Sequence, residues 1–133
     1  MRAKKRTELD GRRMTSELYT VTLDAADPHR LADFWTELLG YKVVYDSADE
    51  VAIDRPDESG PVVLFIKVPD AKAGKNRMHF DLNPDDQAAE VERALALGAR
   101  RVDIGQSRDP DVTWTVLADP EGNEFCILTP RSD

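Results

Sequence analysis

One pattern of strands and helix occurs twice in this sequence, and this duplication constrains the fold more than any other feature. Residues 18–24 (LYTVTLD) alternate between apolar and polar side chains, as a half-buried strand does, and an amphipathic helix ending at Gly40 follows. The same order begins again at residues 78–83 (MHFDLN). With a shift of 59 residues, "LDAAD" at 23–27 falls on "LNPDD" at 82–86. Two copies of one unit predict two similar modules.

Each copy holds one helix whose ends can be read from the sequence. In the first copy, Asp27 is a suitable N-cap and Pro28 suits the first helical turn. Its apolar face is expected to hold Leu31, Phe34, Trp35, Leu38 and Leu39. In the second copy, Asp85 or Asp86 caps the helix and Gly98 ends it. The apolar face of that helix is expected to hold Ala88, Val91, Ala94 and Leu95.

Three short strands are expected after each helix. They span residues 42–46, 50–54 and 62–68 in the first copy and lie around 100–104, 112–118 and 124–129 in the second. Each copy is then a βαβββ unit whose helix covers one face of its sheet, so the other face is buried or lines a cavity. The predicted fold class is α+β, with two tandem βαβββ modules.

The modules belong to one domain preceded by a basic leader. The expected boundaries are a disordered leader at 1–16 and a domain at 17–131, which consists of module 1 (17–68), a linker (69–76) and module 2 (77–131). Residues 1–13 carry six basic and two acidic side chains, a net charge of +4, so the remainder of a chain of net charge −8 carries −12. A domain this acidic repels phosphate backbones, which argues against a nucleic-acid partner.

Composition also indicates the compartment. No apolar run approaches the roughly 20 residues that span a bilayer, so no membrane partner is expected. The basic start lacks the apolar segment of a secretory signal. The single cysteine, Cys126, rules out an intrachain disulfide and suits a reducing environment. A cytoplasmic protein is therefore expected.

Three segments resemble a known superfamily. They are "TLDAADPHRLADFWTELLGY" at 22–41, "GKNRMHFDL" at 74–82 and "VLADPEGNEFCIL" at 116–128, and they occur in the family's order. The sequence resembles the vicinal oxygen chelate (VOC) superfamily, and within it the small glyoxalase-like domains. The resemblance implies paired βαβββ modules that form a cup-shaped mixed sheet. It also implies four cup positions that hold a metal in metal-dependent members, here Thr20, Ile66, His79 and Cys126.

Those four residues form a poor metal shell. A catalytic divalent ion takes about three protein ligands from His, Asp, Glu or Cys. Among them His79 is a good ligand, Cys126 suits softer metals, Thr20 is poor and Ile66 cannot bind an ion. By strand alternation, Asp24 shares a face with Thr20, and Asp81 shares one with His79, which would allow a rearranged shell. No metal cofactor is predicted, and a divalent metal in an atypical shell is the alternative.

Other roles for these residues remain open. His79 is either a structural histidine bonded to a neighbour such as Asp81 or a ligand-orienting group and general base. Cys126 is a buried inert thiol or, with His79 as its base, a nucleophile. Trp114 is a core residue or a flat wall for an aromatic ligand. The candidate ligand-binding residues are His79, Trp114, Cys126, Thr20, Ile66 and Asp81.

Three functions agree with these observations. The favoured one is a metal-free domain that binds a small molecule in the cup. The second is a metal-dependent lyase, isomerase or ring-cleaving dioxygenase, and the third is a partner-binding or regulatory domain. Because related domains pair across a two-fold axis, and isologous pairing is the commonest soluble assembly, a homodimer is expected.

Overall fold

The computed structural model describes residues 17–69, 74, 78–102 and 112–130, so the expected leader at 1–16 and most of the linker at 69–76 lie outside the described residues. The chain divides into two compact units, Met1–Pro69 and Asp70–Asp133. Each unit contains one module, and each is described by itself. Among the described residues, neither helix combines the length and apolar character needed to cross a membrane.

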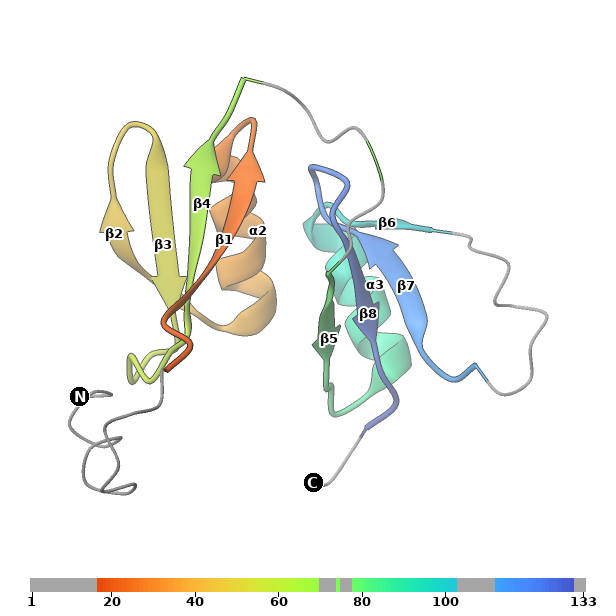
Figure 1. The fold of residues 1–133 in the computed structure, drawn as a ribbon. Coiled ribbons are helices and arrows are strands. Elements are labelled where there is room, and N and C mark those ends of the chain that lie inside the picture. Colours follow the sequence, from red (N-terminus) through yellow and green to blue (C-terminus); the bar gives the residue numbers. More distant parts are fainter. Residues whose placement is uncertain (1–16, 70–73, 75–77, 103–111, 131–133) are drawn as a thin grey trace. The chain divides into compact units, whose positions relative to one another are not determined.

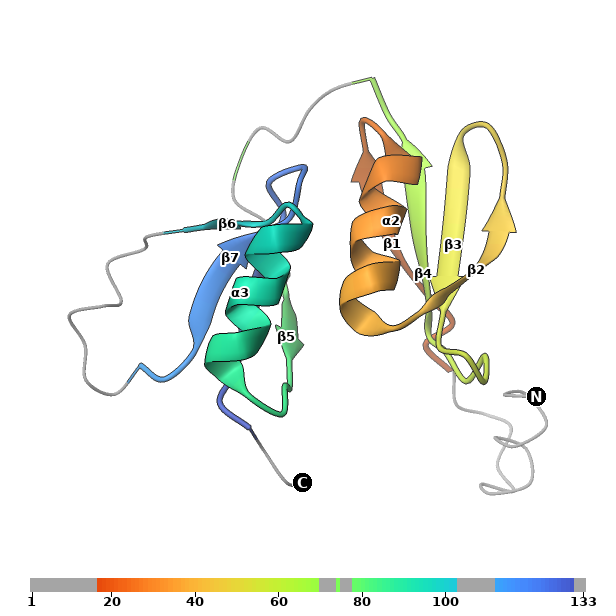
Figure 2. The same ribbon diagram turned by 180° about the vertical axis from the view of Figure 1, so that it is seen from behind.

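The first module has the expected βαβββ order (Figure 1). Its elements are β1 (Thr20–Ala25), α2 (Pro28–Leu39), β2 (Lys42–Asp46), β3 (Glu50–Asp54) and β4 (Val62–Lys67). The sheet order is β1-β4-β3-β2, in which the first strand runs parallel to the last and the other pairs are antiparallel. Figure 2 shows α2 lying across one face of this sheet.

The sequence correctly predicts both ends of α2. The side chain of Asp27 accepts a hydrogen bond from the Arg30 amide at 3.2 Å, and Gly40 adopts a left-handed conformation with φ of 69°. That conformation lets the Gly40 amide donate to the Thr36 carbonyl, and it favours glycine. Six residues of the helix are buried: Pro28, Leu31, Ala32, Phe34, Trp35 and Leu38. The rings of Phe34 and Trp35 meet edge to face, with centroids 5.1 Å apart.

The second module repeats the topology with shorter elements. They are β5 (Phe80–Leu82), α3 (Gln87–Leu97), β6 (Arg100–Arg101), β7 (Thr115–Ala118) and β8 (Glu124–Ile127). The order β5-β8-β7-β6 again places the first strand parallel to the last. The predicted fold class, α+β with two βαβββ modules, is confirmed. Only the beginning of the strand expected around 100–104 is present as β6, and residues 103–111 lie outside the described ranges.

Helix α3 is capped like α2 but is less deeply buried. Of the two predicted caps, Asp86 takes the role and accepts a hydrogen bond from the Ala89 amide at 3.1 Å. Gly98 ends the helix and donates to the Ala94 and Leu95 carbonyls. Only Val91 and Ala94 are buried. Ala88 was expected on the apolar face and is exposed, so that prediction was wrong; its methyl group adds little apolar surface to bury.

A buried aspartate closes the corresponding turn of each module. Asp54 ends β3 and Asp119 follows β7, and each side chain is only 1% exposed. Asp54 accepts hydrogen bonds from the amides of Arg55 and Gly60 at 2.7 and 2.9 Å. Asp119 accepts from the amides of Glu121 and Asn123, both at 2.9 Å. These bonds satisfy turn amides that burial would otherwise leave without partners.

Candidate functional site

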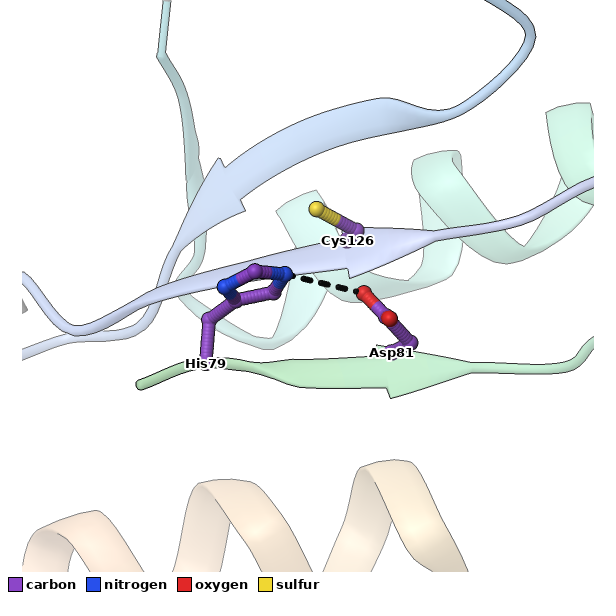
Figure 3. Close-up of side chains that lie close together, drawn as sticks. All are labelled: His79, Asp81 and Cys126. Atoms are coloured by element: carbon purple, nitrogen blue, oxygen red, sulfur yellow. Dashed lines mark ion pairs between the residues drawn. The ribbon is translucent and has the colours of Figure 1, made fainter. Parts of the chain in front are cut away.

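Three of the predicted site residues lie together in the second module. One possible ligand atom from each of His79, Asp81 and Cys126 lies within 4.8 Å of the other two. Figure 3 shows the imidazole and the carboxylate facing each other beside β5, with the thiol on the adjacent β8. The His79 Nε2 atom is 3.2 Å from Asp81 Oδ1.

Strand register brings these residues together although the sequence separates them. Strand β5 pairs in parallel with β8, and Asp81 stands directly opposite Cys126. The neighbours of Cys126, Phe125 and Ile127, are 1% and 0% exposed and belong to the core. Since side chains alternate along a strand, Cys126 points to the opposite face, which is named the open face here. His79 immediately precedes β5 and is two residues from Asp81, so alternation assigns it to the open face as well.

The cluster combines half-exposed polar groups with a buried thiol. The side chains of His79 and Asp81 are 51% and 53% exposed, whereas Cys126 is 7% exposed. Burial raises the pKa of the Cys126 thiol from the usual 9.0 to about 11, and the charge of Asp81 and a hydrogen bond to it act in the same direction. The negative charge of Glu124 also raises this pKa. Cys126 is therefore a protonated hydrogen-bond donor at neutral pH, which does not suit a nucleophile that must act as a thiolate.

Trp114 extends the same side of the sheet. It precedes β7, and alternation places it on the side of Val116, which pairs with Cys126. Trp114 is 39% exposed, so part of this large residue faces solvent. Trp114 is thus not a fully buried core residue and can offer an apolar plane.

The first module places no comparable group at the corresponding positions. Thr20 begins β1 opposite Val62, whereas Ile66 lies opposite Asp24 at the other end of the strand pair. Under the 59-residue shift, Thr22 corresponds to Asp81, and the residue opposite Thr22 is Leu64. By strand register, the counterpart of Cys126 in the first module is therefore Leu64. A constant shift of the sequence without gaps does not identify this residue. Neither leucine nor isoleucine can bind an ion.

Comparison with protein families matches residues 20–128 to the glyoxalase-like domain. The chain belongs to this glyoxalase-like family. The resemblance to the VOC superfamily is thereby confirmed, and it covers nearly all of both modules. No curated protein matches the sequence significantly.

Solved structures share the fold of this glyoxalase-like domain at low sequence identity. A glyoxalase/bleomycin resistance protein/dioxygenase family enzyme from Burkholderia phytofirmans PsJN is 18% identical, with a TM-score of 0.67, and the match covers 87% of this chain and 100% of that one. A possible glyoxalase from Bacillus cereus is 11% identical, with a TM-score of 0.63 and coverages of 86% and 99%. A bleomycin resistance determinant encoded on the transposon Tn5 is 21% identical, with a TM-score of 0.57 and coverages of 88% and 100%.

The residues of this glyoxalase-like domain fit a metal only in part. At the four positions implied by the resemblance, Thr20 and Ile66 lack a suitable donor. Asp81 supplies a third donor in the second module, so nitrogen, oxygen and sulfur ligands lie close together. Three protein ligands are the usual number around a catalytic zinc ion. To become a good ligand, however, the Cys126 thiol must first lose a proton that its surroundings retain.

Proposed function

We propose that this glyoxalase-like domain binds a small organic molecule on the open face of its second module and needs no metal to do so. The observation that carries the proposal is the half-exposed His79–Asp81 pair beside a buried, protonated thiol. Small-molecule binding is what the VOC fold suggests, and among the described residues this cluster brings three polar side chains together where they can orient a ligand.

Each side chain has a distinct role in the proposed complex. Asp81 holds the His79 imidazole through Nε2, so the ring can present its other nitrogen to a ligand. The neutral Cys126 thiol donates its one hydrogen bond to Asp81 and so helps to hold that carboxylate in place. Trp114 supplies an apolar plane for an aromatic or aliphatic part of the ligand. The negative charges of Asp81 and Glu124 favour a neutral or cationic ligand over an anionic one.

A ligand screen with a matched pair of histidine variants tests this proposal. The control is His29, whose Nε2 lies 2.8 Å from Asp46 Oδ1 and whose side chain is 47% exposed, much as for His79. Libraries of neutral, cationic and anionic aromatic compounds are screened by thermal shift, where a ligand at a hundred times its Kd adds about 2.7 kcal/mol of stability. Hits should stabilise the wild type and His29→Ala but not His79→Ala. Hits that stabilise all three proteins equally would place the binding site elsewhere.

The proximity of three donors favours a second candidate, a metal-dependent lyase, isomerase or dioxygenase. In this case His79, Asp81 and Cys126 would hold the ion. A bound ion supplies Lewis-acid polarisation of a substrate oxygen. Within this chain, the buried position of Cys126 would exclude water from one side of the ion.

Elemental analysis distinguishes the two candidates. A metal-dependent enzyme should retain stoichiometric Zn, Fe, Mn or Ni through purification, and His79→Ala should lose it while His29→Ala keeps it. A metal-free binding domain should give the same thermal shifts before and after treatment with a chelator. Loss of every ligand-induced shift on chelation would overturn the metal-free proposal.

A further inference from the structure

Gln87, the first residue of α3, binds two main-chain carbonyls that lie far from it in the sequence. Its Nε2 atom donates hydrogen bonds to the Thr113 carbonyl at 2.8 Å and to the Ile127 carbonyl at 3.0 Å. A glutamine amide carries two N–H donors, so each carbonyl can receive one of them. These bonds connect the beginning of the helix to the segment before β7 and to the end of β8.

The two carbonyls lie where β7 and β8 stop pairing with each other. The last pair of this antiparallel ladder is Thr115 opposite Ile127. In the same register Thr113 would face Thr129, but neither of these residues belongs to a strand. The Gln87 amide therefore supplies a donor to the Thr113 carbonyl beyond the end of the ladder, and the same NH2 group also binds the end of β8.

The bond to Thr113 acts directly on the backbone of Trp114. The carbonyl of Thr113 and the amide nitrogen of Trp114 belong to one planar peptide unit, so a bond that holds the carbonyl also fixes the direction in which the chain enters Trp114. On the other side of Trp114, the ladder with β8 holds Thr115. Trp114 thus lies between two anchored neighbours, and alternation assigns its side chain to the open face.

Gln87 belongs to the helix and not to the open face. Helix α3 lies across one face of the second sheet (Figure 2). Its buried residues, Val91 and Ala94, belong to the core of the module. The open face carries the side chains that point away from this core. Gln87 can therefore influence a ligand on the open face only through Trp114.

We propose that Gln87 is a positioning residue that fixes Trp114 in the orientation in which its ring receives a ligand. The inference rests on the proposed function, because it concerns the same site. A group held in its bound arrangement before the ligand arrives loses less freedom on binding, which increases affinity. Because Trp114 lies outside β7, the ladder alone does not hold it. The ligands that depend on Gln87 are those whose flat apolar part lies against the indole.

Tryptophan fluorescence of the full chain tests the link between Gln87 and Trp114 without any ligand. The isosteric Gln87→Glu variant replaces the donor by a carboxylate that can only accept. A negative charge in the first helical turn is favourable, so α3 should remain folded, which circular dichroism checks. The chain has two tryptophans and Trp35 is only 1% exposed, so acrylamide quenches mainly Trp114. The Stern–Volmer constant should rise in Gln87→Glu, because the released segment exposes the ring.

The matched control is Glu92→Gln, which exchanges the same two side-chain types in the other direction. Glu92 also joins α3 to the sheet, since its Oε2 atom lies 3.3 Å from Arg101 Nη2 of β6, and both side chains are exposed. Loss of this exposed ion pair should leave the quenching unchanged. An equal rise in Glu92→Gln, or no rise in Gln87→Glu, would overturn the proposal.

A double-mutant cycle distinguishes positioning of Trp114 from general support of the fold. The probes are the aromatic compounds that stabilise the wild type in the thermal-shift screen. Gln87→Glu should raise their Kd by about fivefold, as the loss of an ordinary hydrogen bond does. In a Trp114→Ala background the same substitution should change Kd by less than about twofold, because Gln87 acts through the ring. Equal losses in both backgrounds would overturn the proposal. A screen in which no compound binds would overturn the proposed function together with this role, whereas unchanged quenching overturns the role of Gln87 alone.

Discussion

The two modules share one topology but differ in how deeply their helices are buried and in what their open faces carry. Helix α2 buries six residues, including Trp35, whereas α3 buries Val91 and Ala94 alone. The second module instead carries the cluster of His79, Asp81 and Cys126. Among the described residues, the first module has threonine and aliphatic side chains at the corresponding positions. The same fold thus serves in one copy mainly as a packed scaffold and in the other as the candidate site.

The largest expected difference between the modules concerns their helices. Trp35→Ala removes a side chain that is 1% exposed, so it should lower the free energy of unfolding by about 3–5 kcal/mol. Val91→Ala removes only two methyl-sized groups and should cost about 1–2 kcal/mol. Urea denaturation measures both values. Equal losses would contradict the inferred difference in packing.

The buried turn aspartates should behave alike in both modules. Asp54→Ala and Asp119→Ala each leave buried amides without an acceptor, which should cost about 1–3 kcal/mol. The exposed Asp49 is the control, since Asp49→Ala should change stability by less than about 0.5 kcal/mol. Thermal and urea unfolding measure the effect. If Asp54→Ala and Asp119→Ala change the free energy of unfolding as little as the control does, the hydrogen bonds in these turns do not stabilise the fold.

The helix caps should have a smaller and similar effect. Asp27→Ala and Asp86→Ala each remove an N-cap bond and should cost about 1 kcal/mol. Asp85→Ala should have almost no effect, because Asp86 is the residue that accepts from the helix amide. Denaturation midpoints of the three variants check this order. If Asp85→Ala lowered stability as much as Asp86→Ala is expected to, Asp85 rather than Asp86 would be the N-cap of α3.

A change beside the Cys126 thiol is expected to have the smallest effect on stability at neutral pH. Its effect is measured as a shift in the pKa of the thiol. Asp81→Asn removes a negative charge beside Cys126, so the thiol pKa should fall from about 11 toward 9.0. Asp85→Asn is the control, because Asp85 is not among the groups that raise this pKa. The chain has one cysteine, so NMR of protein carrying 13C-labelled cysteine reports its titration without overlap. An unchanged pKa in Asp81→Asn would mean that burial and Glu124, rather than Asp81, raise it.

The same shift predicts how alkali affects stability. The folded thiol pKa of about 11 lies above the unfolded value near 9.0, so its contribution to stability is complete below pH 9 and is lost as the pH rises toward 11. Cys126→Ser should remove this part of the pH dependence. The difference between wild-type and variant unfolding curves at pH 8 and pH 10.5 measures it. A constant difference between those pH values would contradict the raised pKa.

Local features of the fold could be predicted from the sequence. The caps at Asp27 and Asp86 and the stops at Gly40 and Gly98 depend only on neighbouring residues, and all four occur as expected or as one of two alternatives. Exposure was harder to predict. The apolar centre of β2 is typical of a buried strand, yet the strand stands at the edge of its sheet.

The candidate site could be predicted only in part. Alternation along one strand was enough to place His79 and Asp81 on the same face. Their proximity to Cys126 depends on a parallel pairing between β5 and β8, which alternation within a single strand does not specify. The superfamily resemblance selected Cys126, while the residue in the matching place on β4 could be identified as Leu64 only from the observed register.

The pairing of first with last strands also governs the order in which the chain can fold during synthesis. Each sheet needs its final strand as a neighbour for its initial one, so the first module can close once Lys67 has left the ribosome. The second must wait for Ile127, and until then β5 has no strand beside it. A nascent chain halted between these two points would carry a folded first module, while His79, Asp81 and Cys126 would not yet be held together.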